Sequence, residues 1–179
     1  MVNTIFLVSG IVILLIFLLS LSVIHIRSVR DDLDNRWYNL AEKLQYRQDL
    51  MPNLIETVRL FIPAEKLSVH KVLIQKSIDL RHAAAKNIEP GSDKIIEEHE
   101  LSKKIEELIQ LGKKYDALGK STNYLELSKE FKDLRKQIEE LTIDYNNKVR
   151  NYNSIIARPY NLPPALLMKY RKKLVFEFV

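Results

Sequence analysis

The chain has 179 residues, with 28 Lys and Arg against 23 Asp and Glu, 46% hydrophobic residues, and no cysteine. Only 4 Gly and 6 Pro are present, which favours one helical domain over a sandwich or barrel with many turns. The lack of cysteine excludes disulfides, thiolate metal ligands and a thiol nucleophile. No charged side chain precedes Arg27, so an uncharged apolar leader is followed by a highly charged body.

The leader is apolar from Thr4 to Ile26, and about 23 residues at ~1.5 Å each are enough to cross a bilayer. We therefore predict a transmembrane anchor within residues 1–27. The alternative is a cleaved signal peptide, which the length of the run and the lack of preceding basic residues disfavour. Because Lys and Arg follow the run and none precedes it, the positive-inside rule predicts an outer N-terminus and a cytoplasmic body.

The body, residues 28–158, has apolar residues at steps of three and four, which is the period of one helix face. Pro52 interrupts the first such pattern, which predicts either a kink near Leu50 or a new helix capped by Asp49. The stripe of this first helix is predicted to contain Val29, Leu33, Trp37, Leu40, Leu44, Met51, Leu54, Val58 and Phe61.

Pro63 predicts the start of a second helix, residues 64–86, whose apolar stripe includes Val72, Ile74 and Ala85. A turn at residues 87–92 precedes a third helix, residues 93–111.

Gly112 is expected to end that third helix. Its segment 97–100, Glu-Glu-His-Glu, is interpreted as a solvated charged face. A fourth helix of about 35 residues is predicted from Asn123 to just before Pro159, with Asn123 and Glu126 as a weak capping box. Its near-heptad stripe includes Leu134, Ile138 and Leu141.

These elements predict an all-α protein, in which an N-terminal transmembrane helix is followed by an antiparallel four-helix bundle with long first and last helices. A single extended coiled coil is the alternative. The breaks at Pro63, Pro90-Gly91 and Gly112 disfavour it.

The tail, residues 159–179, mixes large apolar side chains with cations. In an antiparallel bundle the last helix returns toward the bilayer, so we expect the tail to contact anionic headgroups. A solvated basic end is the alternative, and no recognised motif supports nucleic-acid binding. The expected membrane contacts are Arg27, Arg30, Lys169, Arg171, Lys172 and Lys173.

Motifs for catalysis are absent from the sequence: it has no His-Glu-x-x-His, Gly-rich phosphate loop or nucleophile elbow. A di-iron bundle would need two Glu-x-x-His motifs. The nearest segment, Asp79 to His82, has Asp for Glu and no second copy. We expect no cofactor, no metal and no enzymatic activity.

Two polar features remain. Tyr145-Asn146 and Tyr152-Asn153 are seven residues apart, which predicts tyrosines in the core and amides that fix helix register. A ligand or partner surface is the alternative. The second feature is a group of polar residues around Pro52, interpreted either as a functional site or as the cap of a kink.

At these residues the chain resembles the LemA family of bacterial membrane-anchored proteins. Residues 47–58 are similar to its Arg-Arg-x-Asp-Leu-Ile-Pro-Asn-Leu-Val-Glu-Thr-Val segment, and residues 145–153 to its Tyr-Asn-x-x-Val-x-x-Tyr-Asn. Residues 115–118 and 123–127 resemble its Tyr-Pro-x-Leu and Asn-x-Phe-x-x-Leu. The residues matched to the two main motifs are Arg47, Asp49, Pro52, Asn53, Glu56, Tyr145, Asn146, Tyr152 and Asn153.

The resemblance implies a helical bundle on one anchor in the bacterial inner membrane, without an established enzymatic activity. The LemA family also includes proteins that belong to the magnetosome membrane of magnetotactic bacteria. We therefore expect a membrane-tethered scaffold whose partners are lipids and unidentified proteins, with self-association left open. The alternatives are a membrane-organising role, including magnetosome formation, and an enzyme or metal carrier.

Overall fold

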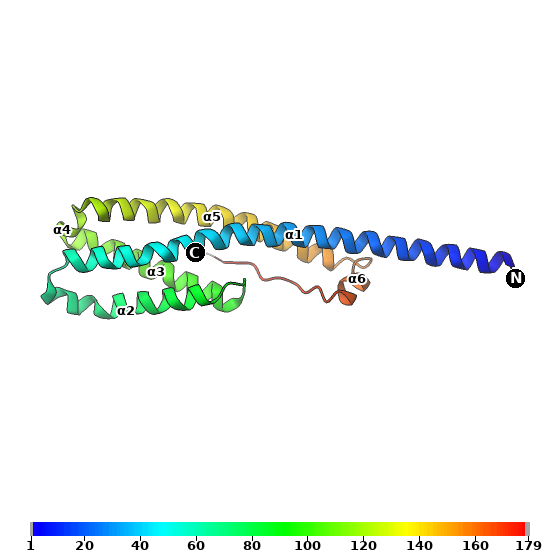
Figure 1. Ribbon diagram of the computed structural model, residues 1–179, viewed down its shortest axis with the longest axis horizontal. Coiled ribbons are helices and arrows are strands. Elements are labelled where there is room, and N and C mark those ends of the chain that lie inside the picture. The colour runs from blue at the N-terminus through cyan, green and yellow to red at the C-terminus, as the bar shows by residue number, and fades with distance from the viewer. Residues whose placement is uncertain (1, 178–179) are drawn as a thin grey trace. The chain divides into compact units, whose positions relative to one another are not determined.

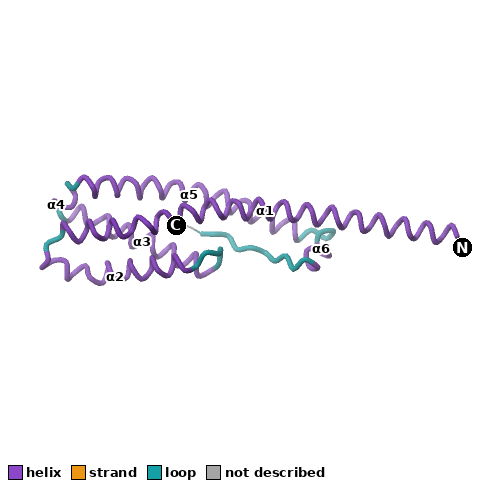
Figure 2. Tube along the Cα trace, in the orientation of Figure 1, coloured by secondary structure: helices purple, strands orange, loops and turns teal. Residues whose placement is uncertain are grey.

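The computed structural model describes residues 2–177, and within this part of the chain all regular structure is helical. Figures 1 and 2 show the helices, and the predicted all-α class is confirmed. The six helices are α1 (Val2–Phe61), α2 (Ala64–Lys86), α3 (Ser92–Lys114), α4 (Asp116–Gly119), α5 (Thr122–Ile156) and α6 (Leu162–Leu167).

The chain forms two compact units. Of the described residues, the anchor unit comprises 2–36 and 144–175, and the bundle unit comprises 37–143 and 176–177. Both α1 and α5 contribute to each unit, because each helix passes the boundary between them.

In the bundle unit, the second part of α1 bonds to each of the other long helices. Arg47 of α1 binds α3, the backbone of Gln48 accepts a hydrogen bond from α2, and Thr57 accepts one from α5. Apolar stripes of the four helices meet in a core that includes Leu44, Leu54, Ile74, Leu101, Leu108, Phe131 and Ile138. The predicted four-helix arrangement therefore holds within this unit.

In the anchor unit, residues 3–21 of the apolar segment of α1 are all exposed, whereas Ile26 near its end is buried. By its length and composition, this helix is long and apolar enough to cross a membrane. Further along α1, Asp32 accepts a hydrogen bond from Lys148 Nζ at 2.6 Å, and Arg36 pairs with Asp144 at 3.1 Å. These contacts join α1 to the end of α5 inside this unit.

Three predicted helix boundaries differ from the structure. A new helix capped by Asp49 is wrong, because α1 continues through Pro52. Gly112 does not end α3, which continues to Lys114. Asn123 does not cap α5: the helix starts at Thr122, and the amide of Asn123 instead donates to Thr57 Oγ1 at 2.7 Å. The kink near Leu50 stays a prediction.

The apolar stripes were also wrong in places. Phe61 and Val72 are exposed, and Ala85 is exposed while its neighbour Ala84 is buried. In α5, Thr142 takes the buried position and Leu141 is only half-buried. In α5, where the stripe was predicted from heptad spacing, a strict seven-residue repeat drifts around a straight helix by about 20° per heptad, which moves the buried position from Leu141 to Thr142.

Candidate functional site

The first polar feature is the helix interior around Pro52. Proline lacks an N–H, so the carbonyl four residues earlier loses its helical donor. That carbonyl belongs to Gln48, and Arg81 Nε of α2 donates to it at 2.8 Å. The same guanidinium lies 3.9 Å from Asp49. Arg81 thus replaces the missing hydrogen bond and ties α2 to α1.

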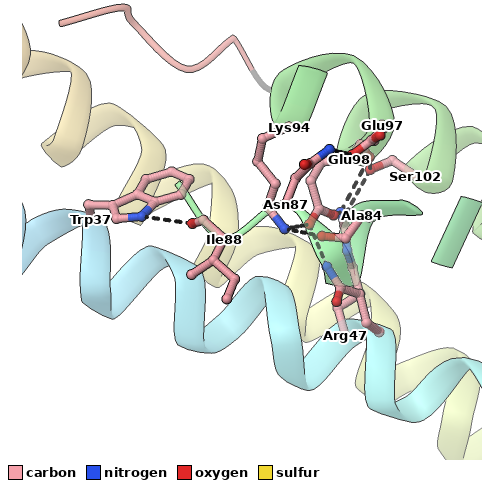
Figure 3. Close-up of polar contacts among 10 residues, drawn as sticks. Trp37, Arg47, Ala84, Asn87, Ile88, Lys94, Glu97, Glu98 and Ser102 are labelled. Carbon is pink, nitrogen blue, oxygen red and sulfur yellow. Dashed lines mark hydrogen bonds and ion pairs between the residues drawn. The ribbon is translucent and has the colours of Figure 1, made fainter. Parts of the chain in front are cut away.

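Beside this position lies a mostly buried group of charged and polar residues, which we call the Glu98 cluster: Arg47, Gln48, Lys94, Glu98 and Ser102. Figure 3 shows Arg47, Lys94, Glu98 and Ser102 of this cluster. Glu98 has no solvent exposure. Its carboxylate accepts hydrogen bonds from Arg47 at 2.5 Å and Gln48 at 2.6 Å, and it forms an ion pair with Lys94 at 2.7 Å. Both carboxylate oxygens are therefore occupied, and the cluster joins α1 to α3.

The cations of the Glu98 cluster make further bonds. Arg47 also donates to Ser102 Oγ at 2.7 Å, and Lys94 Nζ donates to the carbonyl of Ala84 at 2.7 Å, in the last turn of α2. A cation at a helix C-terminus is favourable because the carbonyls there lack helical donors. Burial lowers the pKa of the Arg47 guanidinium, and the charge and hydrogen bond of Glu98 oppose that shift.

The remaining residues of the first motif do not converge on this cluster. Asn53 and Glu56 are exposed. The backbone carbonyl of Asn53 accepts a hydrogen bond from Thr57, whose hydroxyl in turn accepts one from Asn123. Two segments that resemble family motifs are thus joined where α1 ends and α5 begins.

The second motif belongs to the anchor unit, whereas the first belongs to the bundle unit. Tyr145 and Tyr152 are both buried, which confirms the predicted core position of the rings. Burial, followed by the charge of Asp34, raises the pKa of Tyr145 to about 12. Burial also raises the pKa of Tyr152. Both hydroxyls are therefore protonated at neutral pH and act as neutral groups.

The two asparagines of this motif differ in their surroundings. Asn146 is half-buried beside the tyrosine stripe. Asn153 Nδ2 donates to the carbonyl of Lys173 at 2.9 Å, and its Oδ1 accepts from the N–H of the same residue at 2.9 Å. Asn153 therefore holds the backbone of the tail by two hydrogen bonds, a role that the heptad spacing did not predict.

The tail is extended after α6 and makes contacts at several points. In the anchor unit, Arg30 lies 5.4 Å from the ring centre of Tyr170 and forms an ion pair with Asp34 at 3.5 Å. In the bundle unit, the buried ring of Phe176 packs 5.7 Å from Trp37. Arg30 is therefore engaged within the protein.

The predicted tail cations are mostly open to solvent. Lys169, Arg171 and Lys172 are exposed, and Lys173 is half-buried. Arg27 is also exposed. Near the same end of the anchor unit, Asn161 before α6 is hydrogen bonded to Ser22 of the apolar segment and to the carbonyl of Ile155.

Reasoning from the sequence missed the most buried charge of the molecule. Residues 97–100 were interpreted as a solvated face, which is wrong for Glu98. The sequence did contain an indication of this burial. Glu98 lies on one helix face with apolar residues, because Lys94, Glu98, Leu101, Ile105 and Leu108 follow one another at steps of three and four. Arg81 carried no such signal, since only the fold brings it to the carbonyl of Gln48.

No group of three or more metal-ligating side chains occurs among residues 2–177. The buried polar groups described above bind one another or the backbone, so they stabilise helix packing and none is arranged as a nucleophile and base. These features define an all-helical protein whose first helix fits a membrane anchor.

The LemA family model matches residues 36–178 of the chain. This match covers most of the sequence, and the protein belongs to the LemA family. The matched region begins after the apolar segment and includes both motifs. No curated protein shows significant similarity to the chain.

Proposed function

We propose that this protein is a non-enzymatic scaffold, anchored in the bacterial inner membrane by the first part of α1, with the body in the cytoplasm. The observation that carries the proposal is the exposed apolar segment of α1, which leads without a break into a helical body. The buried polar groups of that body bind one another and stabilise helix packing. Partner proteins would therefore bind to its exposed surface.

Orientation is the first part of the proposal to test. The chain has no cysteine, so single substitutions provide clean reporters. Ser68→Cys lies on the exposed side of α2 and should resist a membrane-impermeant thiol reagent in spheroplasts, whereas Asn3→Cys should react. The opposite labelling pattern would place the body outside.

Partner binding is the second part. A photo-crosslinking residue at exposed positions of the bundle unit, such as Leu125 or Ile143, should capture specific proteins in growing cells. The same residue at the buried Leu134 is the control and should capture none. Absence of specific adducts at every exposed position would contradict a scaffold.

A second candidate is a membrane-organising role, including magnetosome formation. It is favoured by α6, where Leu166 is 73% and Leu167 81% exposed. In the same unit, Asn161 before α6 bonds to Ser22 in the apolar segment. Because Ser22 belongs to the predicted membrane segment, Leu166 and Leu167 would lie close to the membrane surface, where exposed leucines can insert into the interface. The tail cations that follow them would attract anionic headgroups.

Vesicles with and without anionic lipid test this second candidate. Full-length protein reconstituted with anionic lipid should protect residues 166–173 from proteolysis, and neutral lipid should protect them less, because the headgroup field attracts the tail. The variant with Lys169, Arg171, Lys172 and Lys173 changed to Gln should lose the difference. Equal cleavage in both lipids would remove the tail from the mechanism.

A further inference from the structure

A groove of 740 Å³ lies between α3 and α5 in the bundle unit. Its walls run from Ser102 to Lys113 on α3 and from Ser128 to Glu139 on α5. Each wall spans about three helical turns, or ~16 Å. The groove therefore has the length of a short docked helix.

The lining of the groove is amphipathic. Its floor is lined by the half-buried Ile109 and by the edges of two core residues, Ile105 and Phe131, which are themselves buried. Ser128 also lines it, and its Oγ is buried without a hydrogen-bond partner in the described chain. An apolar floor of this kind suits the apolar face of a helix, which is recognised through residues at steps of three and four.

The rim of the groove is strongly basic. Its two acidic residues, Glu106 and Glu139, are both paired with Arg135, at 3.7 and 3.0 Å. The rim also has four exposed lysines: Lys113, Lys129, Lys132 and Lys136. None of them forms an ion pair with another described residue, so their charges remain available to an acidic ligand.

The inner wall adds to this positive charge. Arg47 of the Glu98 cluster reaches the groove, and the cluster contains two cations, Arg47 and Lys94, for the single carboxylate of Glu98. Charges in a concave surface with apolar walls attract a ligand of opposite sign more strongly than the same charges on a flat surface. The net charge of the groove therefore favours an acidic occupant over a basic one.

We propose that the groove between α3 and α5 binds an acidic amphipathic helix of a partner protein. The apolar face of that helix packs over Ile105, Ile109 and Phe131, and its carboxylates pair with the rim lysines. This inference rests on the proposed scaffold function and names the surface and the kind of partner. A nucleic acid would match the charge but would leave the apolar floor uncovered.

Two synthetic peptides of about 14 residues, ~21 Å as helices, provide the probe. Both have leucines at helical spacing, with glutamates on the flanks of one and lysines on the flanks of the other. Fluorescence anisotropy with the full chain in detergent micelles should show binding of the glutamate peptide, weakening as salt screens the lysines. The lysine peptide should not bind.

Substitutions then locate the contact. Lys132→Gln with Lys136→Gln should weaken binding of the glutamate peptide about tenfold. The matched control, Lys71→Gln with Lys86→Gln on α2, removes the same charge from exposed positions outside the groove and should leave it unchanged. Helical circular dichroism verifies that every variant is folded.

Equal binding of both peptides, or equal loss in the control, would overturn the proposal. Displacement of the glutamate peptide by an oligonucleotide of equal charge at lower concentration would assign the groove to nucleic acid instead. A result that rejects the groove as a binding site can be distinguished from one that rejects the scaffold function. Photo-crosslinks formed in cells at Leu125 or Ile143 but none at Gln110 in the groove would reject only this site.

Discussion

Removal of the buried carboxylate in Glu98→Ala is expected to destabilise the protein more than any surface substitution. Glu98 is fully buried, accepts hydrogen bonds from Arg47 and Gln48, and forms an ion pair with Lys94. Its loss leaves two buried cations without a counter-charge, which typically costs about 3 to 5 kcal/mol. For a chain of this size, ~1 kcal/mol shifts the thermal midpoint by about 2 to 4 °C, so we expect a drop of roughly 6 to 20 °C.

Replacement of the whole group should recover most of that loss. Buried ion pairs pay a desolvation cost that nearly cancels their attraction, so well-packed apolar residues of similar volume are often equally stable. The compensated variant combines Arg47→Met, Gln48→Leu, Lys94→Met and Glu98→Leu. Its expected residual loss comes from the carbonyl of Ala84, which no longer accepts a hydrogen bond from Lys94.

Thermal unfolding of the full chain in detergent micelles, followed by circular dichroism, measures both effects. Glu107→Ala is the matched control, because Glu107 is an exposed acid on the same helix, paired only with Lys104. It should change the free energy of unfolding by less than about 1 kcal/mol. A Glu98→Ala midpoint equal to that of Glu107→Ala would refute the burial argument. A compensated variant as unstable as Glu98→Ala would refute the desolvation argument.

Three further outcomes are expected. Gly112→Ala should lower stability by about 1 to 3 kcal/mol despite its better helix propensity, because a Cβ there would overlap the ring of Tyr124; thermal unfolding measures the loss. Tyr145 has a pKa of about 12, above its usual value. Its contribution is therefore complete below about pH 10 and is lost toward pH 12, at ~1.4 kcal/mol per pH unit, so midpoints measured across this range should fall less in Tyr145→Phe. Asn153→Ala removes both hydrogen bonds to the Lys173 backbone, so trypsin should cleave the tail faster.

Matched substitutions distinguish these mechanisms from general damage. Gly91→Ala places a Cβ in open space and should be nearly neutral. Tyr160→Phe alters an exposed ring and should keep the alkaline decline of the parent protein. Asn151→Ala removes an exposed amide of α5 and should leave tail cleavage unchanged. If a test variant and its control change the measured property equally, the explanation given for the tested residue is contradicted.

The sequence alone determined the apolar segment that fits a membrane anchor, the all-α class and the bounds of α2. The apolar run up to Ile26 depends only on composition and length. The bounds of α2 follow from local chemistry, because Pro63 favours a helix start and residues 87–91 favour a turn. The buried rings of Tyr145 and Tyr152 were equally predictable, since helical periodicity places both on one stripe.

Only the tertiary structure decided what the polar residues do. Arg81 and the carbonyl of Gln48 are 33 residues apart, and Asn153 and Lys173 are 20 apart, so no local pattern connects them. Glu98 shows the physical reason most clearly. A carboxylate among other charges is cheap to leave in water and costly to bury alone, so its place in the core depends on Arg47 and Lys94 arriving from other turns and helices.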